Sequence, residues 1–143
     1  MQIDWPELEP SPNTYDIESF EQRLADMQSQ GLQTFLLISA YDSGEPVVPD
    51  DLKDKDFDDP EFIRRFKNLM DWVIPLLIEY DGFLISISNE AENSFAEIPG
   101  LDDQILEFLQ EIKKHIHQID DNMAVTVTFS EGSLDDDKPG IYS

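Results

Sequence analysis

The feature that most constrains the fold of this chain is a regular alternation of short apolar runs with longer segments of helical periodicity. The apolar runs are 34–39 (TFLLIS), 83–88 (FLISIS) and 123–129 (MAVTVTF). Runs of this kind are typical of strands that are covered on both faces. A fourth strand is expected at residues 2–10 (QIDWPELEP), a short and mixed segment that Pro6 interrupts.

The segments between these runs repeat apolar residues at steps of three and four, which predicts helices at 13–31, from 59 to about 77, and at 101–119. The residues expected to mark or disturb the helix ends are the N-caps Asp16 and Asp59, Pro60 in a first turn, Gly31 after a last turn, and Pro75, which should kink its helix. The apolar stripe of the second helix is Phe62, Phe66, Leu69, Val73 and Leu77.

The order strand, helix, strand predicts parallel strands joined by right-handed crossovers, and therefore the α/β class. The 143 residues suit a single domain, residues 1–143. Two folds have this order: a small doubly wound sheet, or about half of a (β/α)8 barrel, which takes ~250 residues when whole. Both folds place functional residues at the carboxyl ends of the strands.

The composition narrows the range of partners. The chain has 32 Asp and Glu against nine Lys and Arg, for a formal net charge of −23. A protein this acidic repels phosphate backbones and anionic lipid, so we expect neither nucleic-acid nor membrane binding. The apolar stretches are shorter than the ~18 residues of a membrane helix, and the first residues do not resemble a secretion signal, so the compartment stays unknown.

Several familiar sites are not supported by the sequence. There is no cysteine, no Gly-rich phosphate loop after the first strand, and no G-x-S-x-G elbow. The two histidines, His115 and His117, are two apart on one helix and so face different directions, which makes them poor partners for one metal. We therefore expect no cofactor.

The segment from Tyr41 to about Asp59 is expected to be an acidic loop, and the run 51–61 (DLKDKDFDDPE) invites comparison with a calcium loop. Asp54, Asp56 and Asp58 match the first three ligand positions of an EF-hand, but Asp59 stands where Gly is required and Arg65 where the loop needs Glu. A solvated acidic loop is the better interpretation, and no metal site is predicted.

The predicted strand ends carry carboxylates, aromatic side chains and one Asn, which is the equipment of carbohydrate chemistry. Cleavage of a glycosidic bond needs one acid to protonate the leaving oxygen and one carboxylate to attack or to activate water. Aromatic rings stack on sugars, and amides hydrogen-bond hydroxyls. The strand 83–88 runs directly into Asn89 and Glu90, which makes this strand end the leading candidate.

These motifs resemble those of the clan A glycoside hydrolases, the (β/α)8-barrel group that includes cellulases and β-galactosidases. The run ISISNE, ending in Asn89 and Glu90, is similar to that family's fourth strand. The positions similar to its second and third strands are Trp5, Glu9, Pro10, Tyr15, Asp16, Gly31 and Leu32. The resemblance covers residues 5 to about 129.

The resemblance implies a role for individual residues. Glu90 looks like the general acid/base, and Asn89 like the neighbour that contacts the substrate hydroxyl beside the reacting carbon. By position alone, the cleft would be lined by Trp5, Glu9, Tyr41 and Asp42; for Trp5 and Tyr41 the alternative is packing under a loop. Glu92 is expected to be a bystander.

The chain departs from the family in extent, because it matches only strands two to five. The family's nucleophile is a second Glu at the end of the seventh strand, for which this chain has no equivalent. The chain is therefore predicted to be a fragment of a larger retaining hydrolase, to supply the acid/base half of the site, and to be inactive alone. Its open sheet edges favour self-association. The alternative is a non-catalytic half-barrel or small α/β module that binds carbohydrate or a partner.

Overall fold

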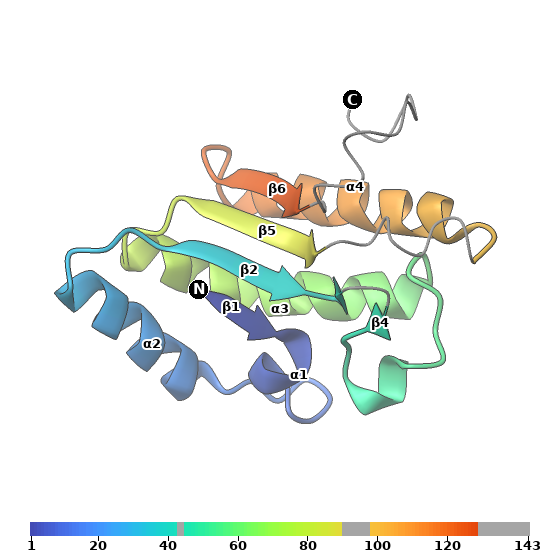
Figure 1. Ribbon diagram of the computed structural model, residues 1–143, viewed down its shortest axis with the longest axis horizontal. Coiled ribbons are helices and arrows are strands. Elements are labelled where there is room, and N and C mark those ends of the chain that lie inside the picture. The colour runs from blue at the N-terminus through green and yellow to red at the C-terminus, as the bar shows by residue number, and fades with distance from the viewer. Residues whose placement is uncertain (43–44, 90–97, 129–143) are drawn as a thin grey trace.

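The computed structural model describes residues 1–42, 45–89 and 98–128 of the chain (Figure 1). Its elements, in order, are β1 (Gln2–Asp4), α1 (Trp5–Leu8), α2 (Ile17–Ser29), β2 (Phe35–Ser39), β3 (Tyr41–Asp42), β4 (Glu45–Pro46), a 3-10 turn (Asp50–Leu52), α3 (Pro60–Glu79), β5 (Leu84–Asn89), α4 (Leu101–Ile119) and β6 (Ala124–Thr128). No helix in these ranges is long and apolar enough to cross a membrane.

The main strands pair in the order in which the chain makes them. β1 pairs with β2, β2 with β5, and β5 with β6, all in parallel. A doubly wound sheet would reverse its strand order at a switch point, whereas a barrel adds each strand beside the last. Of the two folds that the sequence allowed, the partial (β/α) barrel is therefore confirmed, and the sheet curls as part of one.

One face of the sheet packs against α3 and α4, which lie behind it in Figure 1. The strand side chains buried there are apolar: Ile3, Leu36, Ile38, Ile85 and Ile87. Leu36 and Ile85 are direct neighbours across the β2–β5 pair. The predicted stripe of α3 is buried along its whole length, so burial of apolar area on this face supplies most of the driving force for folding.

The helix ends follow the sequence closely. The Asp16 side chain accepts a hydrogen bond from the Ser19 N–H at 3.2 Å, and Asp59 accepts one from the Glu61 N–H at 2.8 Å. Gly31 follows the end of α2 with φ of 72°, which glycine adopts without strain. α3 continues through Pro75 to Glu79, so Pro75 does not end the helix.

Two segments differ from the prediction. The N-terminal strand ends at Asp4, and α1 follows at once, with Pro6 in its first turn, where a missing N–H costs little. The stretch expected to be only an acidic loop contains a short antiparallel pairing, in which β3 pairs with β4, and a 3-10 turn. β3 also pairs with the end of β5, through Asp42 and Asn89, so this segment is part of the sheet edge.

Candidate functional site

Polar side chains from β1, β3 and β5 meet around Asp42, which lies beside the carboxyl end of β5. The Asn89 Nδ2 atom, at the end of β5, donates a hydrogen bond to Asp42 Oδ1 at 2.8 Å. The Gln2 Nε2 atom, from β1 on the other side, donates to Asp42 Oδ2 at 3.4 Å. The Asp42 carboxylate thus accepts from side chains on both flanks, and Asn89 is held in place at the edge where a barrel carries its chemistry.

An irregularity in β5 decides which way Asn89 points. Ser86 pairs with Thr126 and Asn89 with Thr128, so three steps along β5 correspond to two along β6. Strict alternation would place Asn89 on the same face as Ile85 and Ile87, toward the helices. The extra residue turns Asn89 to the opposite face, which is a common use of bulges beside functional sites.

The face of the sheet opposite the helices is polar near this edge, although Ser39 and Ser86 on it are buried. The hydroxyls of Ser86 and Thr128 lie 3.1 Å apart, linking β5 to β6. Ser39 is paired with Asp4 across β1 and β2, and its buried Oγ has no hydrogen-bond partner within the described residues. Hydroxyl and amide groups therefore replace the aliphatic side chains that fill the other face.

The edge is also electrically negative. Burial raises the pKa of the Asp4 carboxyl above its ordinary value of 3.8, and the nearby charges of Glu7 and Asp42 raise it further. Glu7 accepts a hydrogen bond from the Asp4 backbone N–H at 3.2 Å, which holds it at the start of α1. Such a surface favours neutral or cationic ligands over anions.

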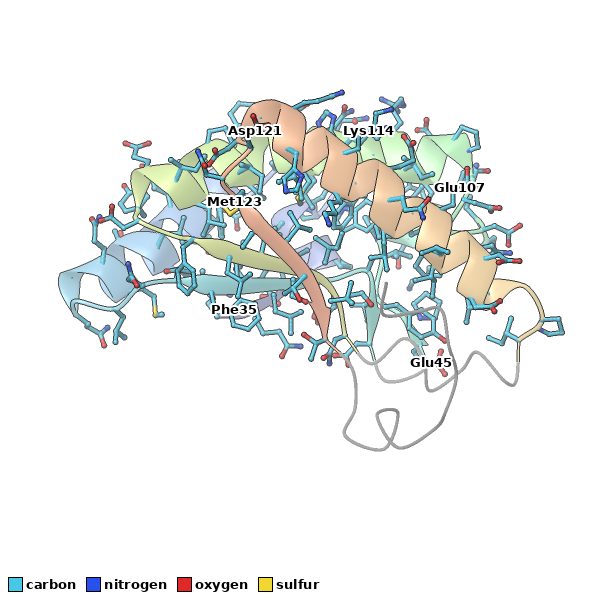
Figure 2. All side chains as sticks on the ribbon, turned by 90° about the horizontal axis from the view of Figure 1, so that it is seen from above. Phe35, Glu45, Glu107, Lys114, Asp121 and Met123 are labelled. Atoms are coloured by element: carbon cyan, nitrogen blue, oxygen red, sulfur yellow. The ribbon has the colours of Figure 1, made fainter. Side chains whose placement is uncertain are left out.

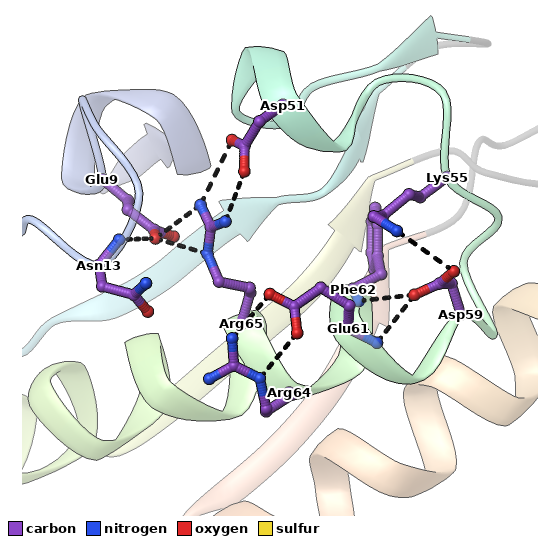
Figure 3. Close-up of polar contacts among 9 residues, drawn as sticks. All are labelled: Glu9, Asn13, Asp51, Lys55, Asp59, Glu61, Phe62, Arg64 and Arg65. Carbon is purple, nitrogen blue, oxygen red and sulfur yellow. Dashed lines mark hydrogen bonds and ion pairs between the residues drawn. The ribbon is translucent and has the colours of Figure 1, made fainter.

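Glu9 belongs to a buried network with Arg65 (Figure 3), to which Trp5 also contributes. Glu9 is 1% exposed and accepts hydrogen bonds from Trp5 Nε1 at 2.7 Å, from the Asn13 N–H at 2.7 Å and from Arg65 Nε at 2.8 Å. Arg65, 2% exposed, donates on its other side to Asp51 at 2.6 Å. The network ties the loop after β1 and the 3-10 turn to α3.

The ionisation of this network follows from its contacts. The hydrogen bond from Arg65 lowers the pKa of the Asp51 carboxyl below 3.8. Burial disfavours the charged guanidinium of Arg65, but its hydrogen bonds with Asp51 and Glu9 outweigh burial and raise its pKa. The paired charges are therefore kept at neutral pH.

The aromatic candidates lie in the core. Trp5 has no exposed surface and meets Phe62 and Phe66 edge-to-face, with ring centroids 5.2 and 4.8 Å apart. Tyr41 is buried against Phe57 at 5.5 Å. Of the two sequence-based alternatives for these rings, this placement corresponds to packing beneath the loops.

The structure therefore divides the six candidate residues into three groups. Asn89 and Asp42 are brought together at the sheet edge, and both are partly buried. Trp5, Glu9 and Tyr41 lie behind that edge, where they support the loops. Glu90 lies outside the described residues.

Sequence reasoning missed Gln2 and the bulge in β5. Gln2 carried no signal because a glutamine in a short N-terminal strand is unremarkable. The bulge has no sequence mark either, since the run from 84 to 89 shows no Gly or Pro. Among the described residues, no group of three or more His, Cys, Asp or Glu side chains is placed to hold a metal ion.

A comparison with solved structures shows which known fold this partial (β/α) barrel resembles. The chain superposes on an exo-beta-1,4-mannosidase, Op5Man5 from Opitutaceae bacterium strain TAV5, with a TM-score of 0.72 and 19% identity. The match covers 90% of this chain and 24% of that chain, so it spans about a quarter of the mannosidase. No family model matches the sequence, and no curated protein matches it. At this identity the likeness is one of fold.

Proposed function

We propose that this chain supplies the acid/base half of the active site of a retaining glycoside hydrolase. The observation that carries the proposal is the placement of Asn89, fixed by Asp42 at the carboxyl edge of a partial barrel and followed directly in sequence by Glu90. The superposed mannosidase suggests β-1,4-linked mannosides as the first substrates to assay.

In the proposed reaction Glu90 acts twice. Its protonated carboxyl group gives a proton to the leaving oxygen while a carboxylate from outside this chain attacks the sugar carbon and forms a glycosyl-enzyme. The resulting Glu90 carboxylate then removes a proton from the water that hydrolyses this intermediate, which restores the acid. Asn89 contacts the hydroxyl beside the reacting carbon. In this proposal Asp42, which binds Asn89, borders the substrate.

Trp5, Glu9 and Tyr41 have a supporting role in this proposal. Their side chains hold the loops that follow β1 and β2, and these loops border the cleft. Their removal is expected to change stability first and catalysis as a consequence.

The proposal is tested with a matched pair of variants, Glu90→Gln and Glu92→Gln. Both are made in the complete hydrolase of which this chain is proposed to be a part. Both remove one carboxylate from the same short segment and keep the side-chain size. Loss of a general acid/base group costs on the order of 10²–10⁴ in rate. We expect a loss of that size for Glu90→Gln and a change of less than about threefold for Glu92→Gln, measured as kcat/KM on a β-1,4-mannoside.

Undiminished hydrolysis by Glu90→Gln contradicts the assignment. If no glycoside is hydrolysed by wild type but sugar binding is retained in both variants, the chain is a carbohydrate-binding module, and the acid/base role of Glu90 is wrong.

A further inference from the structure

We propose that Asp42 is a positioning residue, which acts through Asn89 by fixing the orientation of its amide toward the ligand. The inference rests on the proposed function for its kinetic consequence, but its structural part is tested without any turnover. It assigns a specific task to the carboxylate in the short β3 strand.

The first argument is the chemistry of the contact. An ionised carboxylate has only acceptor oxygens, so it must face the NH2 end of the Asn89 amide and not the carbonyl end. The 2.8 Å distance from Nδ2 to Asp42 Oδ1 is that of a well-formed N–H···O hydrogen bond. The contact thus selects one of the two flipped states of the amide.

The second argument is the rigidity of the Asp42 carboxylate. The backbone of Asp42 is paired with Asn89 in the sheet, so both ends of the contact are set by the same strand register. Gln2 donates to the second carboxylate oxygen from the opposite flank, at 3.4 Å. The strand pairing is therefore the main restraint on the position of Asp42, and the longer Gln2 contact adds a weaker one on its carboxylate.

The third argument is the bulge that precedes Asn89. The irregular pairing of β5 with β6 turns Asn89 away from the helices, onto the face that carries Asp42 and Thr128. A buried strand gains nothing in packing from exposing an amide in this way. The backbone and Asp42 therefore act together to aim this amide.

The ligand consequence follows from the remaining groups of the amide. With one N–H directed to Asp42, the carbonyl oxygen and the second N–H hold a fixed relation to the site. A sugar hydroxyl, which both donates and accepts, suits such a pair. In a flipped amide the carbonyl oxygen and the NH2 group exchange positions, and in a freely rotating amide neither is fixed. Such an amide would discriminate less between a hydroxyl and a hydrogen on the sugar carbon beside the reacting one.

The structural test uses side-chain amide NMR of the 143-residue chain. In wild type we expect separate Nδ2 proton signals for Asn89, one of them shifted downfield, and restricted motion of the Nδ2 group. Asp42→Leu removes both acceptor oxygens and should abolish the shift and the restriction. Asp42→Asn keeps one acceptor oxygen and should recover part of both. Glu45→Gln, which removes a charge from the strand paired with β3, is the control and should change neither.

The kinetic test is a double-mutant cycle in the active protein. Asp42→Leu should lower kcat/KM by about ten- to a hundredfold for a mannoside and far less for its 2-deoxy analogue. In an Asn89→Ala background the same change should have almost no further effect, because a residue that acts through Asn89 loses its role with it.

The two proposals fail in different ways. An Asn89 side chain that is equally restricted in wild type and in both Asp42 variants overturns the positioning role, whatever the protein hydrolyses. Additive effects in the cycle overturn it too. A third outcome is that the Asn89 side chain is restricted in wild type and freed in Asp42→Leu, while no glycoside is hydrolysed. That outcome supports the positioning role of Asp42 and contradicts only the hydrolase assignment.

Discussion

The two faces of this one sheet carry different kinds of side chain at the carboxyl ends of its strands. The face toward the helices is lined by aliphatic residues with almost no exposed surface, such as Ile38 and Ile87. The other face changes along the strands, from Phe35 beside Leu84 at the amino ends to Asp42 beside Asn89 at the carboxyl ends. Phe35 is 40% exposed and lies on the side of the sheet away from α4 (Figure 2).

This difference between the two faces indicates that one face stabilises the fold and that the other carries the polar groups of the candidate site. Apolar burial on the helix face stabilises the fold, and its residue pattern can vary only in ways that preserve volume. The polar carboxyl end of the other face adds little stability, yet the irregular strand and the Asp42 contact are concentrated there. This is the arrangement expected when a sheet holds a site at one end of its strands.

The largest expected loss of stability comes from truncating a buried side chain between the sheet and the helices. Phe66 on α3 is fully buried and contacts Trp5 and Phe108. Phe66→Ala should lower the free energy of unfolding by about 3–5 kcal/mol, because it removes the ring and leaves a cavity. Phe35→Ala makes the same change on the face of the sheet opposite the helices and should lower the free energy of unfolding by under about 1 kcal/mol. Urea denaturation of both variants measures the contrast, and equal losses would contradict it.

The next effect comes from the buried ion network behind the site. Arg65→Met leaves Glu9 as a buried charge without its cation and should destabilise the protein by about 3 kcal/mol. Arg64→Met, at the adjacent position, removes only an exposed contact with Glu61 and should change the stability far less than Arg65→Met does. Thermal unfolding of the two variants provides the comparison. A small loss for Arg65→Met would mean that the network is not structural.

A smaller effect is expected in the acid range. The folded-state pKa of Asp51 is lowered below its ordinary value of 3.8, so its contribution to stability is present above pH 3.8 and is lost as the pH falls through the lowered pKa. The Asp51 side chain is 43% exposed, which keeps this contribution under about 1 kcal/mol. Asp51→Asn should therefore be less stable than wild type above pH 4, with the gap closing on acidification. A gap that is constant with pH would show that the charge of Asp51 does not matter.

The side chains on the helix face could be predicted from the sequence, because apolar periodicity and helix capping depend only on residues close together in the chain. The stripe from Phe62 to Leu77 and the caps Asp16 and Asp59 each follow from spacing or from one side-chain type. The parallel order also followed from the alternation of elements. The choice between a doubly wound sheet and a partial barrel needed the strand neighbours, which no local pattern specifies.

The site could be predicted only in outline. The end of the strand at Asn89 was found because an apolar run stops there. The contact between Asp42 and Asn89 depends on a register across 47 positions and on a bulge without a Gly or Pro to mark it. Trp5, Glu9 and Tyr41 have the residue types of a sugar cleft, but the same types also fill cores, and only the packing tells the two apart.

The central claim, that Glu90 protonates the leaving group, is tested most directly by the dependence of the Glu90→Gln defect on that group. A substrate whose leaving group is a weak base departs without a proton, whereas a sugar or alkyl leaving group needs one. We expect Glu90→Gln to slow glycosyl-enzyme formation from a β-1,4-linked mannobioside by at least about 10²-fold, but from a dinitrophenyl mannoside by less than about tenfold, in the pre-steady state. An equal loss on both substrates, or no loss on either, would contradict the assignment of Glu90 as the acid.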